Sequence, residues 1–286
     1  MTLKAGFVGL GYIGKLMALQ LPKAGLETTV FDIVPAPMEE LAAAGAKAAR
    51  SPREVAAASD VVGVCVQTDA QVRAVVESED GLLAGARPGL VIAVHSTVLP
   101  STVQAVHAEA AKRGVEVIDA CVSGQSREKE PNYKLFLAGD PAAIAKAEPY
   151  TKAIAKRVIQ AGALGNSCKA KICLNLITYL QWTAAFESAS LAKATGLPLE
   201  VLEEAGRSNG QLTELMIQYL GTLKMPEAMR KSDDMQAYLR TQMHVAEKDL
   251  AHALALGRDA GVTLPGAALV SQLMARIYAV DDPKRR

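Results

Sequence analysis

The sequence predicts an α/β domain built on a largely parallel sheet, followed by an all-helical domain. Two observations support this fold class. Over residues 1–162, short apolar runs alternate with helical patterns, as in chains that wind strands and helices into one sheet. After residue 162, every apolar pattern has the helical period. The stretch 162–175 therefore reads as a hinge that opens a long helix, and we predict domains at 1–162 and 163–286.

The composition limits the possible function. A length of 286 residues fits about two domains, and 50% hydrophobic residues can bury a sizeable core. Lys plus Arg is 31 and Asp plus Glu is 30, so bulk charge predicts binding to neither nucleic acid nor an anionic membrane. No apolar run reaches the ~20 residues of a membrane span. The four cysteines show no paired metal-ligand spacing, so we expect no metal and a reducing, cytoplasmic location.

The first elements carry the most specific pattern. Residues 5–10 form a nearly all-apolar run, as expected for a strand buried on both faces. A glycine turn, a helix over 13–24 and a strand over 28–31 follow, and Asp32 comes directly after that strand. This order is the dinucleotide-binding fingerprint of a Rossmann domain in its required context. The cofactor-binding residues predicted here are Gly9, Gly11, Tyr12, Ile13, Gly14 and Asp32.

Each glycine of this turn has a physical reason. Gly9 allows the tight turn, Gly11 lets the backbone approach a pyrophosphate, and Gly14 lets helix and strand pack closely. The N–H groups at the start of the helix face the phosphates. Asp32, about 20 residues after the turn, is placed to accept hydrogen bonds from a ribose diol. No arginine occurs in residues 33–36 to meet a 2′-phosphate, which favours NAD over NADP.

The alternation continues to residue 162. Further strands are expected at 61–66, 90–94, 115–118, 134–138 and 157–161, with helices at 69–76, 101–113 and 141–155. Ligands bind outside the carboxyl ends of such strands. This rule predicts Gln67, Thr68, Ser96 and Thr97 as cofactor contacts and places residues 121–126 on the same rim. His95 also lies there, and we interpret it as a hydrogen-bonded loop histidine rather than a ligand contact.

The second half is expected to form helices at 167–195, 199–205, 212–223, 235–260 and 265–278. Lys171 and Asn175 share a face of the first of these, because they are four residues apart. An amine beside a carboxamide can supply a proton and hold a polar substrate, although a lone helical lysine is more often simply solvated. His244, Lys248 and His252 also share a face, but a cationic lysine between two histidines argues against a metal site.

Four motifs, taken in order, resemble the β-hydroxyacid dehydrogenase family of the 3-hydroxyisobutyrate dehydrogenase type. The stretch 6–14 looks like its cofactor motif, and 119–125 (DACVSGQ) looks like its substrate motif D-x-P-V-S-G-G. The stretch 162–175 is similar to its catalytic motif G-x-x-G-x-G-x-x-x-K-x-x-x-N, and 248–250 (KDL) to its late K-D-L motif. The resemblance implies a Rossmann domain, an all-helical C-terminal domain like that of 6-phosphogluconate dehydrogenase, and dimers or tetramers.

The resemblance also implies roles for the matching positions. Lys171 would be the general acid/base at the alcohol or carbonyl oxygen. Ser123, Gly124 and Asn175 would hold the substrate, and Lys248 would lie near both nicotinamide and substrate. The implied reaction is hydride transfer between NAD and a small β-hydroxy acid, with no nucleic acid or membrane involved.

Several positions depart from the family pattern. Cys121 stands where the family usually has Pro, and Ser167 replaces the third Gly of the catalytic motif. Gln125 replaces the second Gly of the substrate motif. Gln125 or Arg127 would contact a second polar group of the substrate, unless both are solvated loop side chains, which we favour slightly. These changes bear on substrate identity more than on fold.

Two other functions remain as alternatives. Imine reduction on the same fold usually has another residue where Lys171 stands. A catalytically silent NAD-binding protein would have lost the lysine. The chain keeps both Lys171 and Asn175, which favours the dehydrogenase. A 6-phosphogluconate-type substrate fits less well, because the chain is short and lacks an obvious arginine cluster to clamp phosphate.

Overall fold

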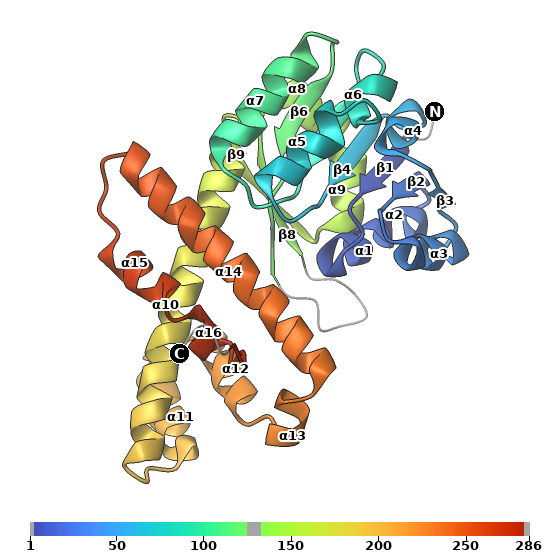
Figure 1. Cartoon of the computed structure of the whole chain (residues 1–286). Helices are drawn as coiled ribbons and strands as arrows, with labels where there is room; N and C mark the ends of the chain where they lie inside the picture. Colours follow the sequence, from blue (N-terminus) through green and yellow to red (C-terminus); the bar gives the residue numbers. More distant parts are fainter. Residues whose placement is uncertain (1–2, 125–132, 283–286) are drawn as a thin grey trace. The chain divides into compact units, whose positions relative to one another are not determined.

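The computed structural model of the chain describes residues 3–124 and 133–282 (Figure 1). It divides into two compact units, Met1–Lys171 and Ile172–Arg286. Helix α10 (Asn166–Ala194) begins in the first unit and continues through the second. In the described ranges, no helix has both the length and the apolarity needed to cross a bilayer.

The described residues of the first unit form a nine-stranded sheet in the order β3-β2-β1-β4-β5-β6-β8-β7, with β9 paired to β8. Strands β1 to β6 are mutually parallel where they pair. The central strands β4 and β5 are buried at every residue, which explains why their sequences are apolar without alternation. The strands are β1 (Lys4–Val8), β2 (Glu27–Phe31), β3 (Lys47–Ala48), β4 (Val61–Val64), β5 (Val91–Val94), β6 (Glu116–Asp119), β7 (Val122–Ser123), β8 (Lys134–Ala138) and β9 (Arg157–Gly162).

Helices cover both faces of this sheet (Figure 1). Neighbouring strand residues point to opposite faces, so Val61 joins one apolar core and Val62 the other. One core packs residues of α1 (Tyr12–Ala18), α2 (Gln20–Lys23), α3 (Pro35–Ala43), α8 (Pro141–Lys146) and α9 (Glu148–Ile154) against the sheet. The other packs residues of α4 (Pro52–Ala57), α5 (Asp69–Glu77), α6 (Leu82–Gly85) and α7 (Pro100–Ala111). These observations confirm a Rossmann-like N-terminal domain.

The structure differs from the sequence-based expectation at several elements. The helix expected at 265–278 is divided into two, Pro265–Ser271 and Met274–Ile277. The helix expected at 13–24 is divided into α1 and α2, because Pro22 has no N–H to donate to the carbonyl four residues earlier. The helix expected at 141–155 is divided into α8 and α9 where Pro149 interrupts it in the same way. Strand β8 runs antiparallel to β6, and no helix is described between them that would return the chain for parallel pairing.

In the described part of the second unit, every regular element is a helix. After α10 come α11 (Leu199–Ser208), α12 (Glu214–Leu223), α13 (Glu227–Arg230), α14 (Asp233–Asp259), α15 (Pro265–Ser271) and α16 (Met274–Ile277). Its core packs Ala185 and Ala189 of α10 with Leu220 of α12, Met243 and Leu250 of α14, and Met274 of α16. The expected all-helical C-terminal domain is confirmed.

Candidate functional site

The predicted glycine turn connects β1 to α1. Gly9 has φ +93°, and its N–H donates to the carbonyl of Phe31 at 3.1 Å, which ties the turn to the end of β2. A Cβ on Gly14 would lie 2.0 Å from the Gly9 carbonyl oxygen, so the helix packs on the turn at a distance that requires glycine. A Cβ on Gly11 would meet no heavy atom of the described residues within 4 Å. The open space beside Gly11 fits the close approach of a pyrophosphate.

Asp32 lies beside this turn, directly after β2. Its Oδ2 accepts a hydrogen bond from the N–H of Leu10 at 2.5 Å, and its Oδ1 accepts one from Val34 at 2.8 Å. A carboxylate has about four acceptor positions, so capacity remains for hydroxyl donors such as a ribose diol. Tyr12 is 63% exposed and Ile13 is 39% exposed. The turn thus presents an anion-binding backbone, a carboxylate and apolar side chains, which together fit a dinucleotide.

Two of the predicted rim residues have hydroxyl groups that hold the rim itself. The Ser96 hydroxyl is buried and accepts the N–H of Val66 at 2.9 Å. Thr68 caps α5 by accepting the N–H of Gln71, whose side chain accepts the N–H groups of Gln67 and Thr68 in return. The side chain of Gln67 is exposed. Cofactor contact at these positions remains a prediction.

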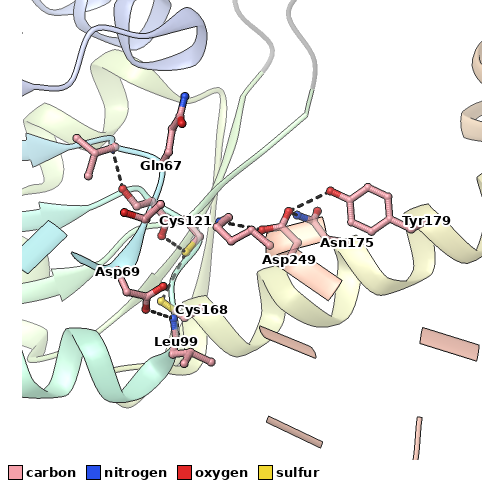
Figure 2. Close-up of polar contacts among 12 residues, drawn as sticks. Gln67, Asp69, Leu99, Cys121, Cys168, Asn175, Tyr179 and Asp249 are labelled. Carbon is pink, nitrogen blue, oxygen red and sulfur yellow. Dashed lines mark hydrogen bonds and ion pairs between the residues drawn. The ribbon is translucent and has the colours of Figure 1, made fainter. Parts of the chain in front are cut away.

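The loop that carries Thr97 is fixed by Asp69. Its Oδ1 accepts the N–H of Leu99 at 2.9 Å (Figure 2). The same oxygen accepts the hydroxyl of Thr102 at 2.6 Å. These bonds anchor the start of α7, where backbone N–H groups lack helical partners. Thr97 itself is half-buried.

His95 is a buried polar residue of the first unit. Its side chain is buried, Nδ1 lies 2.8 Å from the carbonyl of Ala120, and Nε2 lies 2.9 Å from the Tyr150 hydroxyl. Since a carbonyl only accepts, Nδ1 donates and Nε2 accepts from the tyrosine. Burial lowers the pKa of His95 to about 4, so the ring is neutral near pH 7. A Cβ on Gly63 would lie 1.9 Å from the Tyr150 hydroxyl, so that glycine makes room for this pair. The interpretation as a hydrogen-bonded histidine is confirmed.

The predicted substrate segment is fastened to the first turn of α10. Asp119, fully buried, accepts the N–H of Gly165 at 2.9 Å and the N–H of Cys168 at 3.0 Å. Ser167 accepts the N–H of Cys121 at 2.8 Å. The Asp119 carboxylate thereby caps a helix that begins 47 positions further along the chain. Burial raises the pKa of Asp119, and the backbone donors oppose this shift.

The Cys121 and Cys168 side chains lie in contact beneath this segment. Their sulfur atoms are 3.8 Å apart, and the Cys121 thiol also lies 3.4 Å from the carbonyl of Ser96 (Figure 2). Both residues are fully buried. The hydrogen bond with Cys121, with burial and the nearby Asp119, raises the pKa of the Cys168 thiol far above its ordinary value. Cys168 is therefore a neutral packing residue.

Ser123 and Gly124 follow on this segment. Ser123 is the last residue of β7 and is half-buried, and Gly124 has φ +108°, a conformation that favours glycine. Gln125 and Arg127 lie outside the described residues. A polar contact from either residue to substrate remains a prediction.

Lys171 and Asn175 lie about one turn apart on α10. Both are half-buried. The Asn175 amide donates to Oδ2 of Asp249 at 2.6 Å, and the Tyr179 hydroxyl donates to the same oxygen at 3.0 Å (Figure 2). Lys248 forms an ion pair with Oδ1 of Asp249 at 2.9 Å. The buried Asp249 thus orients two predicted substrate-binding residues.

Sequence reasoning missed the roles of Asp249 and Tyr179. Both had a signal in the sequence. Tyr179 is four residues after Asn175 and so shares its helix face, and Asp249 follows Lys248 in the K-D-L motif. Burial raises the pKa of Tyr179, and the Asp249 charge adds to that effect, so the tyrosine is a hydrogen-bond donor at neutral pH.

Comparison with known proteins identifies the family of the chain. Residues 4–162 match the family model described as the NAD binding domain of 6-phosphogluconate dehydrogenase. The chain is 36% identical over 202 residues to NAD-dependent L-serine dehydrogenase of Pseudomonas aeruginosa, covering 70% of this chain and 68% of that protein. It is 30% identical over 271 residues to 3-hydroxyisobutyrate dehydrogenase of the same organism, covering 94% and 90%.

Solved structures give the same result for the fold. A Mycobacterium tuberculosis 3-hydroxyisobutyrate dehydrogenase with L-serine has a TM-score of 0.81 at 26% identity, covering 98% of this chain and 94% of that one. Solved imine reductases, at 16% to 20% identity, share the fold. Given the family match and the relatives at 30% identity or more, the chain belongs to the β-hydroxyacid dehydrogenase family, as an NAD(P)-binding oxidoreductase of the 3-hydroxyisobutyrate dehydrogenase type.

Proposed function

We propose that the protein is an NAD-dependent dehydrogenase that oxidises the hydroxyl group of a small β-hydroxy acid, with Lys171 as general acid/base. The observation that carries this proposal is the attachment of segment 119–124 to the first turn of α10. Asp119 and Ser167 join the two segments by hydrogen bonds that lie three to six residues before Lys171. A segment suited to bind the substrate is thus held next to the helix that carries the amine.

In the proposed reaction, the alcohol carbon loses a hydride and its oxygen loses a proton, which gives an aldehyde. NAD supplies the hydride acceptor when it is bound. Lys171 accepts the hydroxyl proton in oxidation and returns it to the carbonyl oxygen in reduction, a contribution typically worth ~10²–10⁴ in rate. Ser123, Gly124 and Asn175 bind the carboxylate of the acid, and Lys248 lies near substrate and nicotinamide.

NAD is proposed over NADP on the basis of Asp32. Its carboxylate has acceptor capacity for a ribose diol, whereas a 2′-phosphate would meet a negative charge. The next four residues contain no arginine to offset that repulsion. We expect NADH to bind more tightly than NADPH in a fluorescence titration.

The substrate is proposed to be a β-hydroxy acid of the size of 3-hydroxyisobutyrate or L-serine. These compounds appear in the names of relatives that match most of the chain. We further propose a homodimer or homotetramer, because Leu174, Ile177 and Leu191 of α10 are 39%, 50% and 66% exposed. Sedimentation velocity tests this assembly. The free cysteines fit a cytoplasmic location.

The deciding experiment follows absorbance at 340 nm with NAD and a panel of β-hydroxy acids, for wild type, Lys171→Ala and Lys169→Ala. Lys169 is the matched control, because it is an exposed lysine two residues earlier on the same helix. Lys171→Ala should lose about 10²–10⁴ in kcat with NADH affinity unchanged, and Lys169→Ala should keep its rate. Full turnover by Lys171→Ala would refute the mechanism.

The same panel separates the alternatives. Turnover of a cyclic imine with NADPH, without turnover of hydroxy acids, would identify an imine reductase. NADH binding without turnover of either class would identify a silent cofactor-binding protein.

A further inference from the structure

A buried hydrogen bond joins Cys121 to Ser167. The Cys121 N–H donates to the Ser167 hydroxyl oxygen at 2.8 Å, and both residues are fully buried. The carbonyl of Cys121 also accepts the N–H of Phe136 at 3.0 Å, so the residue is held from two sides. A buried backbone N–H that lost its acceptor would destabilise the fold.

The two partners are the same positions that depart from the family motifs. Proline, usual at position 121, has no N–H to donate, and glycine, usual at position 167, has no hydroxyl to accept. In this chain a donor appears at one position and its acceptor at the other. The two departures therefore act as one change, because each would be unfavourable without its partner.

This bond lies close to both parts of the proposed active site. Ser123 is two residues from Cys121, a reach of at most about 7 Å. Lys171 is four residues from Ser167, about 6 Å along the helix. A shift of Ser167 relative to Cys121 would thus be transmitted over a short distance to the substrate segment and to the lysine.

We propose that Ser167 is a positioning residue that holds the Ser123–Gly124 segment in register with the first turn of α10 through the Cys121 N–H. The inference rests on the proposed function, since it concerns how the substrate segment meets Lys171. Ser167 acts on the substrate only through Cys121. The helix stays capped without Ser167, because Asp119 accepts the N–H groups of Gly165 and Cys168.

The test is a set of full-length variants that separates the backbone donor from the cysteine side chain. Ser167→Ala removes the acceptor, Cys121→Pro removes the donor, and Cys121→Ala keeps the N–H but removes the thiol. Ser167→Ala should lower the Tm by about 2–8 °C in the wild-type and Cys121→Ala backgrounds. In the Cys121→Pro background it should change the Tm by less than about 2 °C, because no donor remains.

Ser101→Ala is the matched control. Ser101 is exposed and occupies the second position of α7, as Ser167 does in α10. Its replacement should change neither Tm nor kinetics. Should Cys121→Pro fail to fold, amide hydrogen exchange decides the same point. Faster exchange confined to residues 120–123 in Ser167→Ala supports the bond, and unchanged exchange overturns it.

The kinetic readout distinguishes positioning from simple stability. Measured well below the Tm, Ser167→Ala should raise KM for the hydroxy acid about tenfold, equivalent to about 1.4 kcal/mol, with the Kd for NADH unchanged. A lower Tm with an unchanged KM would reduce Ser167 to a structural role. If Ser167→Ala lowered the Tm equally in the Cys121→Pro background, Ser167 would act through a contact other than the Cys121 N–H. Failure of the proposed function is a separate result, seen as wild-type protein without turnover.

Discussion

The environment of Gly11 predicts that an added methyl group will change cofactor affinity but not stability. Gly11 has φ −60° and ψ −174°, an extended conformation that alanine adopts without strain. A Cβ there meets no heavy atom of the described residues within 4 Å. Replacing glycine by alanine at a helix N-cap lowers stability by up to about 1 kcal/mol. The lower entropy of the unfolded chain with alanine raises stability by about 0.4–1 kcal/mol. The free energy of unfolding of Gly11→Ala should therefore lie within about 0.5 kcal/mol of the wild-type value.

The effect on the cofactor follows from the same open space. The methyl group would stand where the backbone is expected to approach the pyrophosphate. Losing one charge-assisted hydrogen bond to a phosphate costs about 1.5–3 kcal/mol. NADH should consequently bind Gly11→Ala about 10-fold to 150-fold more weakly than wild type.

The assay combines NADH fluorescence titration with urea unfolding, and Gly14→Ala is the matched control. A Cβ on Gly14 would lie 2.0 Å from the carbonyl oxygen of Gly9, a backbone atom that moves only with the turn. Gly14→Ala should therefore lose about 1–3 kcal/mol of stability before any cofactor is added. Wild-type NADH affinity in Gly11→Ala would refute the placement of the pyrophosphate. An equal loss of stability in both variants would refute the conclusion that a Cβ has space at Gly11 and none at Gly14.

Three further predictions concern buried groups. Because the pKa of His95 falls to about 4 on folding, the unfolded chain takes up its proton first, and the free energy of unfolding should drop by about 3 kcal/mol from pH 6.5 to 4. In urea unfolding, His95→Gln should lack this part of the pH dependence. The same fall in the free energy of unfolding with pH in the variant would contradict a neutral, buried His95. Asp249→Asn should lower the free energy of unfolding by about 2–4 kcal/mol, because the carboxylate that accepts the Asn175 amide is replaced by an amide, one end of which is a donor. An unchanged urea midpoint would refute this. Iodoacetamide should label exposed Cys173 well before Cys168, because burial and a raised pKa suppress the reaction of Cys168. Mass spectrometry of tryptic peptides measures the order of labelling, and earlier labelling of Cys168 would contradict the prediction.

The N-terminal fold was predictable because its determinants are local. The apolar run of β4, the glycines of the turn and the acid after β2 each lie within a few residues of the feature they specify. The direction of β8 was not predictable in this way, because it depends on the connection between β6 and β8, whose facing ends are 15 residues apart in the chain. Pro22 and Pro149 were visible in the sequence, and the helix breaks beside them follow from the missing donors.

The site was predictable only in part, because its strongest bonds join distant segments. Asp119 was recognised as the first residue of a motif, but its role as the cap of α10 requires Gly165 and Cys168 to lie beside it. Periodicity assigned Lys171 and Asn175 to one helix face, yet it could not place Asp249, which meets Asn175 from another helix. Side chains that bond across the fold leave no periodic signal in either segment.

The Cys121–Ser167 pair changes how departures from a motif should be counted. Counted separately, the cysteine in the substrate motif and the serine in the catalytic motif are two reasons to expect a different substrate. The Cys121 side chain is fully buried against Cys168 and a backbone carbonyl, so it presents nothing to a ligand. The exchange alters how the segment is held and leaves unchanged Ser123 and Gly124, the residues proposed to bind the substrate. Substrate choice in this protein should accordingly respond to substitutions after position 122 more than to the cysteine itself.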